Sequence, residues 1–318
     1  MKKVLLSKPI QPAAMDILAE KVEPIILPDN SVETTKRLAA DVEGIILRTN
    51  IKVTREIIDA APHLKVISRT GVGVDNVDVP AATEKGILVC HTPGVNAPSV
   101  AEQTLALMLS FSKRLKMMDN AVRAGNWQIR NASKSVDLEG KILGLVGVGR
   151  IGSLVAQKCR LAFNMKVIAY DPYVKRVEGV ELYSSLDQVF SQSDFVSIHV
   201  PYMEQTHHLV NARLLRLMKP DSCLINTSRG AIVDEKALIE ALENESIAGA
   251  GLDVFEKEPP SPDNPLFKFD SVVSTPHSAA LSRECELKVA MAAAQAVVDF
   301  SEGRQPMYIY NKKELQLK

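Results

Sequence analysis

The sequence predicts an α/β fold with two doubly wound parallel-sheet domains. Short apolar runs alternate with helix-like segments along almost the whole chain, a pattern typical of parallel sheets joined by right-handed crossovers. The chain has 318 residues, which exceeds the usual size of a single domain. A turn with the spacing Gly-x-Gly-x-x-Gly near the middle of the chain opens a second series of strands and helices.

The first 95 residues alternate strands and helices. In a parallel sheet, ligands bind beyond the carboxyl ends of the strands. Arg48, the segment 69–75 and the segment 91–96 each follow an expected strand, so they are candidate binding elements. The expected strands are 4–6, 24–27, 44–47, 66–68 and 87–89, with helices at 12–21, 32–40 and 54–60.

Two long helices are expected near residues 98–120 and 282–301. Pro98 suits a first helical turn, and an alanine-rich turn in the second helix suggests close packing. The last residues, 302–318, are too few for a domain of their own, so we expect them to return to the first domain. The predicted domains are 1–97 with 302–318, and 98–301, with the active site in a cleft between them.

The stretch from Lys141 to Gly152 predicts a dinucleotide site. An apolar strand ends in the glycine turn, a helix follows, and a second strand ends in Asp171. Gly147 allows the tight turn, Gly149 lets a pyrophosphate approach, and Gly152 lets the helix pack against the strand. The helix N-terminus offers its amides to the phosphates. Asp171 is placed to accept hydrogen bonds from ribose hydroxyls, which favours NAD over NADP.

The same strand-end rule selects candidate chemical groups later in the chain. Arg229 follows one expected strand, Glu256 and Glu258 follow the next, and His277 follows the last. An arginine fork suits a substrate carboxylate, and a carboxylate beside a histidine favours and orients the imidazolium. The expected strands of this domain are 194–200, 221–226, 249–254 and 271–274.

Histidine is the default acid/base for moving an alcohol proton near neutral pH. Position alone leaves His277 and His91 both open, because each ends a strand. His199 lies within an expected strand, which favours a place in the core. His207 and His208 lie in a polar loop without further ligands in register, so no metal site is predicted.

Several segments together resemble the D-isomer-specific 2-hydroxyacid dehydrogenase family, nearest to its phosphoglycerate dehydrogenase and hydroxypyruvate/glyoxylate reductase branch. The resemblance covers nearly the whole chain and includes the segments 70–78, 93–102, 226–234, 252–259 and 274–277. It implies a Rossmann NAD-binding domain inserted into a discontinuous flavodoxin-like substrate domain.

The resemblance also implies roles for individual residues. Arg229, Glu258 and His277 are expected to form the catalytic set, which leaves Glu256 a surface role. Arg48 is expected at the substrate side chain, and Val72 and Gly73 at the substrate carboxylate. The expected cofactor contacts are Val72, Gly147, Gly149, Arg150, Ile151, Gly152, Asp171, Thr206, Thr227, Ser228, Asp253, Ser278, Ala279 and Ala280.

The implied function is an NAD-dependent dehydrogenase for a D-2-hydroxy acid or 2-keto acid, of the 3-phosphoglycerate, hydroxypyruvate or glyoxylate class. The competing hypothesis is a dinucleotide-sensing regulatory protein, like the corepressors of the same fold. An apolar helix near 101–115 favours a homodimer.

Composition excludes several other classes. Basic and acidic residues balance at 38 each, which argues against a nucleic-acid or membrane-surface partner. No apolar run is long enough to span a membrane. The four cysteines are far apart without Cys-x-x-Cys spacing, which favours reduced thiols and a cytoplasmic protein.

Overall fold

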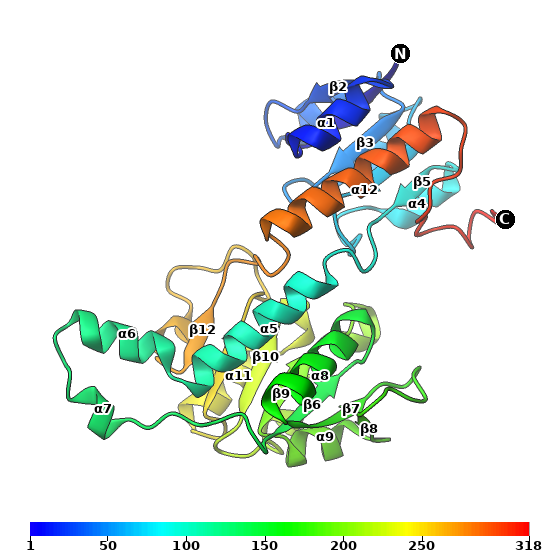
Figure 1. Ribbon diagram of the computed structural model, residues 1–318. Helices are drawn as coiled ribbons and strands as arrows, with labels where there is room; N and C mark the ends of the chain where they lie inside the picture. Colours follow the sequence, from blue (N-terminus) through cyan, green and yellow to red (C-terminus); the bar gives the residue numbers. More distant parts are fainter. Residues whose placement is uncertain (318) are drawn as a thin grey trace. The chain divides into compact units, whose positions relative to one another are not determined.

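The computed structural model describes residues 1–317 and confirms the predicted fold class of two parallel-sheet α/β domains (Figure 1). The chain divides into two compact units, here called unit 1 (Met1–Asn96 with Leu281–Lys318) and unit 2 (Ala97–Ala280). Lys318, which the predicted first domain includes, lies outside the described residues.

Within the described residues, unit 1 is built on a five-stranded parallel sheet of order β2-β1-β3-β4-β5. The strand order reverses between β1 and β3, because β1 pairs with both β2 and β3. This reversal is the topological switch point, where an open α/β sheet binds its ligands. The strands are β1 (Lys2–Leu6), β2 (Val22–Ile26), β3 (Gly44–Leu47), β4 (Val66–Arg69) and β5 (Leu88–Cys90).

Helices cover this sheet and bury its apolar strands. The centre of β3 is almost fully buried, as expected for a sheet covered on both faces. The helices of unit 1 are α1 (Pro12–Ala19), α2 (Val32–Ala39), α3 (Arg55–Asp59), α4 (Val79–Glu84) and α12 (Arg283–Ser301).

Helix α12 lies in unit 1, whereas the sequence pattern predicts it in the nucleotide-binding domain. It packs alongside α1 and against β4 (Figure 1). Its buried face carries Ala290, Ala293 and Ala294, and the Ser68 hydroxyl of β4 donates to the Ala293 carbonyl at 3.0 Å. Small side chains let the helix approach the sheet this closely, so its packing partner is unit 1.

The described part of unit 2 has a seven-stranded parallel sheet of order β12-β11-β10-β9-β6-β7-β8. Its switch point lies between β6 and β9, because β6 pairs with both β7 and β9. The strands are β6 (Ile142–Val146), β7 (Lys166–Tyr170), β8 (Glu181–Leu182), β9 (Phe195–Ile198), β10 (Cys223–Asn226), β11 (Gly249–Leu252) and β12 (Val272–Ser274).

Helices α5 and α8 lie next to each other in unit 2 (Figure 1). The helices are α5 (Ala97–Ser112), α6 (Leu115–Arg123), α7 (Ile129–Ala132), α8 (Arg150–Phe163), α9 (Leu186–Gln192), α10 (Ala212–Leu215) and α11 (Glu235–Glu243). Three short 3-10 helices are η1 (Glu204–Thr206), η2 (Gly230–Ile232) and η3 (Pro265–Lys268).

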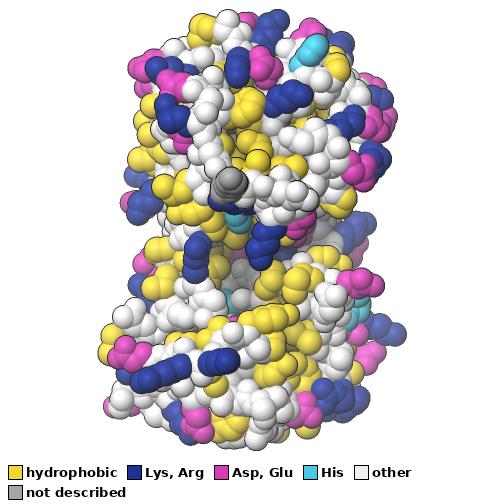
Figure 2. Space-filling view, turned by 90° about the vertical axis from the view of Figure 1, so that its right-hand side faces the viewer, with side chains coloured by type: hydrophobic (Ala, Val, Ile, Leu, Met, Phe, Trp, Pro, Cys, Tyr) yellow, Lys and Arg dark blue, Asp and Glu magenta, His cyan; other side chains and the backbone are white. Residues whose placement is uncertain are grey.

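The expected single helix over 98–120 is two helices. Helix α5 ends at Ser112, and Arg114 adopts a left-handed backbone conformation with φ of 51° before α6 begins. One left-handed residue is enough to redirect a helix, so the continuous prediction was wrong at this point. On the face shown in Figure 2, basic and acidic side chains both occur over each unit.

Candidate active site

The glycine turn between β6 and α8 has the geometry that its sequence predicts. Gly147 has a φ of 92°, and a Cβ there would lie 2.9 Å from the His199 carbonyl oxygen. A Cβ on Gly152 would lie 2.3 Å from the Gly147 carbonyl oxygen, so only glycine allows this contact. A Cβ on Gly149 would meet nothing within 4 Å, so this position faces open space.

Helix α8 begins at Arg150, directly after Gly149, which has no side chain to cap the helix. The amides of the first helical turn, including those of Arg150 and Ile151, have no acceptors within the helix. With the helix dipole, they make the open position at Gly149 suitable for an anion such as a pyrophosphate.

Asp171 follows β7 and is held in place by two backbone amides. Val148 donates to its Oδ2 at 3.0 Å, and Tyr173 donates to its Oδ1 at 2.9 Å. A carboxylate has about four acceptor sites, so both oxygens keep the capacity to accept ribose hydroxyls. The first of these bonds also fixes the carboxylate against the glycine turn.

Two loops predicted to line the cofactor are stabilised by their own hydroxyl groups. The Thr206 hydroxyl donates to the Pro201 carbonyl at 2.8 Å and accepts from the Met203 amide at 2.8 Å. The Ser228 hydroxyl donates to the Val200 carbonyl, which joins the ends of β9 and β10. Thr227 is buried and shares a 3.0 Å hydrogen bond with Thr104 of α5.

The predicted catalytic residues follow three neighbouring strands at the same edge of the sheet. Arg229 follows β10, Glu258 follows β11 and His277 follows β12. His277 Nδ1 lies 2.7 Å from Glu258 Oε2, and Glu258 Oε1 accepts from the Phe255 amide at 3.1 Å. The carboxylate therefore fixes the ring through one of its nitrogens, Nδ1.

The charge state of Glu258 follows from its surroundings. Partial burial by itself would raise the pKa of its carboxyl group. The hydrogen bond and charge of His277, the Phe255 amide and the charge of Arg229 outweigh burial and lower that pKa below its ordinary value of 4.5. Glu258 is therefore ionised at neutral pH, as a partner for an imidazolium must be.

Asp253 holds the backbone that carries His277. Its side chain is 1% exposed, and it accepts from the Ser278 and Ala279 amides at 2.9 Å each and from the Thr275 hydroxyl. Its carbonyl accepts from the His277 amide at 2.8 Å. His277 has a φ of 51°, which is rare for a residue with a side chain, and these bonds hold it there.

Two further contacts join the loops at this edge. A Cβ on Gly230 would lie 1.9 Å from the Phe255 carbonyl carbon, so the loops after β10 and β11 touch through backbone. Glu256, expected to have only a surface role, accepts from His208 across 2.8 Å. It therefore links the loop after β9 to the loop that carries Glu258.

Comparisons with known proteins decide the family. Residues 105–279 match the family model described as D-isomer specific 2-hydroxyacid dehydrogenase, NAD binding domain. The chain belongs to the D-isomer specific 2-hydroxyacid dehydrogenase family. Because the matched domain binds NAD in this family, a nicotinamide dinucleotide is the cofactor of the chain.

Two curated relatives show the range of the family. The chain is 41% identical to D-3-phosphoglycerate dehydrogenase of Archaeoglobus fulgidus over 95% of its length, but it covers only 58% of that protein. It is 38% identical to hydroxypyruvate reductase of Thermotoga maritima, with 93% of this chain and 97% of that protein covered. The chain thus spans about six tenths of the matched phosphoglycerate dehydrogenases, 58% of this one and 60% of that of Methanocaldococcus jannaschii.

Solved structures agree on the fold. A protein from Thermus thermophilus matches with a TM-score of 0.92 and 36% identity, covering 97% of this chain and 99% of that one. D-lactate dehydrogenase of Aquifex aeolicus, solved with NAD and lactic acid, matches with a TM-score of 0.86 and 33% identity, covering 95% and 96%.

Unit 1 holds three of the residues that the family resemblance assigns to the substrate, Arg48, Val72 and Gly73, whereas the fourth, Arg229, lies in unit 2. Val72 and Gly73 lie half-buried in the loop after β4, and the Val72 carbonyl is 3.0 Å from His91 Nδ1. Because a carbonyl only accepts, that ring nitrogen donates. His91 therefore supports this loop, whereas His277 pairs with a carboxylate. Arg48 forms an ion pair with Glu286 of α12 at 2.8 Å.

One residue at the glycine turn is not predicted correctly from the sequence. His199 follows β9 rather than lying within it, and its Nε2 is 2.9 Å from the Ser197 hydroxyl. Burial lowers the pKa of its imidazole to about 3, so the ring is neutral. The strand-end rule that selected Arg229 also applies to His199, because β9 ends at Ile198 and the expected strand extended two residues too far.

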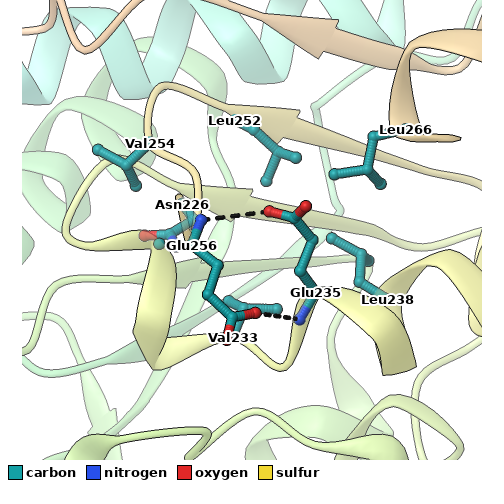
Figure 3. A pocket seen from close by; sticks show the side chains of 9 residues that line it. Asn226, Val233, Glu235, Leu238, Leu252, Val254, Glu256 and Leu266 are labelled. Atoms are coloured by element: carbon teal, nitrogen blue, oxygen red, sulfur yellow. Dashed lines mark hydrogen bonds between the residues drawn. The ribbon is translucent and has the colours of Figure 1, made fainter. Parts of the chain in front are cut away.

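A small, shallow pocket lies beside the predicted catalytic residues, within unit 2 (Figure 3). Glu235 and Glu256 face each other across it, and each carboxylate accepts from the other residue's backbone amide. These contacts fix the start of α11 to the loop after β11. Arg229, Glu258 and His277 do not line this pocket.

Residues 1–317 contain no helix long and apolar enough to cross a membrane. Across the same described residues, no group of three or more histidine, cysteine, aspartate or glutamate side chains is placed to hold a metal ion.

Proposed function

We propose that the chain is an NAD-dependent dehydrogenase acting at C2 of a D-2-hydroxy acid or 2-keto acid, of the 3-phosphoglycerate, hydroxypyruvate or glyoxylate class. The observation that carries the proposal is the 2.7 Å contact between His277 and an ionised Glu258 at the sheet edge that also carries Arg229 and the glycine turn. The names of the relatives indicate substrates of this class.

The bound nicotinamide dinucleotide supplies or accepts the hydride at C2. In the oxidation direction, neutral His277 takes the C2 hydroxyl proton at Nε2. Glu258 stabilises the imidazolium that results, because its negative charge lies 2.7 Å from Nδ1. In the reduction direction, the imidazolium returns this proton to the C2 oxygen.

Arg229 has the role of binding the substrate carboxylate and polarising the C2 oxygen. A guanidinium stays charged and offers a planar fork that matches a carboxylate. Its charge contributes to the lowered pKa of Glu258, which supports a role beside the proposed acid–base pair. Val72 and Gly73 are the proposed carboxylate contacts from unit 1.

The proposed cofactor contacts begin with the glycine turn and the first turn of α8, which hold the pyrophosphate. Asp171 accepts from the adenine ribose, which selects NAD over NADP. The remaining contacts come from the strand-end loops and are Val72, Thr206, Thr227, Ser228, Asp253, Ser278, Ala279 and Ala280.

The test is NADH oxidation with a panel of 2-keto acids. We expect turnover, and we expect His277→Ala to lower kcat/KM by about a hundredfold to ten-thousandfold, as loss of a general acid does. His63→Ala is the matched control, because His63 is exposed and precedes β4. NADH binding without turnover of any keto acid would instead favour the dinucleotide-sensing alternative.

We also propose that the enzyme is a cytoplasmic homodimer. Leu115, Val122 and Trp127 are 53%, 51% and 63% exposed along α6 and the segment that follows it. Such apolar exposure is typical of a contact surface. All four cysteines are buried thiols, which suits a reducing compartment. Sedimentation velocity measures the association, and a monomer at micromolar concentration would refute the dimer.

A further inference from the structure

The switch point of the unit 1 sheet carries a charged cluster. Ser7 follows β1 and Arg48 follows β3, the two strands between which the strand order reverses. An open α/β sheet binds ligands in the crevice beyond this point. Arg48 is thus the cation that the topology of unit 1 places where a ligand is expected.

The backbone of Arg48 is fixed on both sides. Its amide donates to the Ser7 hydroxyl at 2.9 Å, and its carbonyl accepts from the Asn76 side chain at 2.7 Å. Asn50, two residues later, accepts from Ser7 at 2.9 Å. Because the Arg48 backbone is held in this way, the position of its guanidinium depends on the group that the guanidinium binds.

That partner is Glu286. Its Oε1 lies 2.8 Å from Arg48 Nη2, and Gln11 Nε2 lies 3.5 Å from its other oxygen. Glu286 belongs to the first turn of α12, where the helix dipole favours a negative charge. The side chains of Arg48 and Glu286 are 36% and 28% exposed, so solvent still reaches both.

This pairing changes what the crevice can bind. A single arginine fork suits a phosphate or a second carboxylate. Here a carboxylate already pairs with Nη2 of the guanidinium, so an incoming anion must displace Glu286 or share the guanidinium with it, and it then lies close to a second negative charge. An uncharged substituent at C3 of the substrate neither competes with Glu286 nor is repelled by its charge.

We propose that Glu286 sets the substrate class by neutralising Arg48, so that the enzyme takes 2-keto acids with an uncharged C3 substituent over phosphorylated or dicarboxylic ones. This proposal rests on the proposed function and narrows it to the glyoxylate and hydroxypyruvate class. Glu286 is a specificity residue here, and the acid–base set remains on unit 2.

The experiment compares kcat/KM for glyoxylate, hydroxypyruvate, oxaloacetate and 3-phosphohydroxypyruvate with NADH in the full chain. The variants are Glu286→Gln, the double variant Arg48→Met with Glu286→Gln, and Glu284→Gln. The last is the matched control, because it removes the same charge from the same helical turn at an exposed position.

We expect the wild-type enzyme to prefer the substrates without a second anionic group. Glu286→Gln is expected to raise kcat/KM for the phosphorylated substrate by about tenfold, mainly through KM, because a freed guanidinium gains a charge-assisted hydrogen bond. The double variant is expected to lose the gain, and Glu284→Gln to show none.

Several results would overturn the proposal. These are a wild-type preference for the phosphorylated substrate, an unchanged substrate ratio in Glu286→Gln, an equal change in Glu284→Gln, or a gain that survives in the double variant. The wild-type preference keeps the test valid even if a variant fails to fold. Absence of turnover with every keto acid would refute the proposed function itself, which is a separate result.

Discussion

Replacing Asp253 by asparagine tests whether this buried carboxylate supports His277. The substitution keeps the shape of the side chain but removes one acceptor and the charge. In the wild-type protein both oxygens are occupied, by the Ser278 amide and the Thr275 hydroxyl on one side and by the Ala279 amide on the other. An asparagine can accept on one side only, and its NH₂ group then faces a donor.

The size of the effect follows from the donors that lose an acceptor. Leaving a buried donor without an acceptor costs about 1–3 kcal/mol, and the bonds lost were charge-assisted, so we expect a destabilisation of about 2–3 kcal/mol. For a unit of this size that lowers the melting temperature by about 5–10 °C. A shift of His277 by even a fraction of an ångström is expected to lower kcat by about tenfold to a hundredfold.

Two measurements distinguish a structural role of Asp253 from a role in binding the cofactor. Differential scanning calorimetry without cofactor reports the structural loss, and steady-state kinetics report the loss of turnover. Asp263→Asn is the control, because Asp263 is exposed in the same connection between β11 and β12. A melting temperature equal to wild type without cofactor, together with weaker NAD binding, would refute the supporting role and leave only the predicted cofactor contact.

The same region and the glycine turn give three further predictions. Gly230→Ala is expected to lower both stability and kcat/KM, because its Cβ would lie 1.9 Å from the Phe255 carbonyl; activity equal to wild type would refute that contact. Asp171→Ala is expected to reduce the preference for NAD over NADP by about tenfold or more, which parallel kcat/KM values with both cofactors measure; a wild-type preference for NADP would contradict it. The pKa of Glu258 is lowered in the folded protein, so its stabilising effect is present at pH values above the ordinary pKa of 4.5. The effect is lost as the pH falls through the lowered pKa of the folded state. The difference in unfolding free energy between wild type and Glu258→Gln is therefore expected to shrink as the pH falls below 4.5, as urea titrations would show, and a difference independent of pH would contradict this linkage.

The sequence was sufficient for the parts of the site that depend on position along a strand. Glycine spacing predicted the turn at Gly147 and the close packing at Gly152, because these requirements are local. The strand-end rule selected Arg229, Glu258 and His277, because parallel strands bring their carboxyl ends to one edge. The family resemblance then chose Glu258 over Glu256, and the His277 contact agrees with that choice.

The sequence was insufficient where the structure depends on contacts between distant segments. The left-handed Arg114 divides an otherwise continuous apolar helix, and no glycine marks the break. Helix α12 joins unit 1 because its alanine face fits β4, and the hydrogen bond between Ser68 and Ala293 that joins them spans 225 positions. The pairing of Arg48 with Glu286 is of the same kind, since it joins residues 238 positions apart. Local patterns carry no information about such pairs.

The supporting contacts join the three proposed catalytic positions to one another. Gly230 joins the loop of Arg229 to that of Glu258 through backbone, Glu258 joins His277 through its carboxylate, and Asp253 fixes the segment that carries His277. Each loop is therefore oriented by a neighbouring loop rather than by its own strand alone. A substitution in any one of them is expected to displace the others, so their effects on turnover cannot be independent. The geometry of the proposed acid–base pair therefore depends on all the loops at this sheet edge rather than on His277 and Glu258 alone.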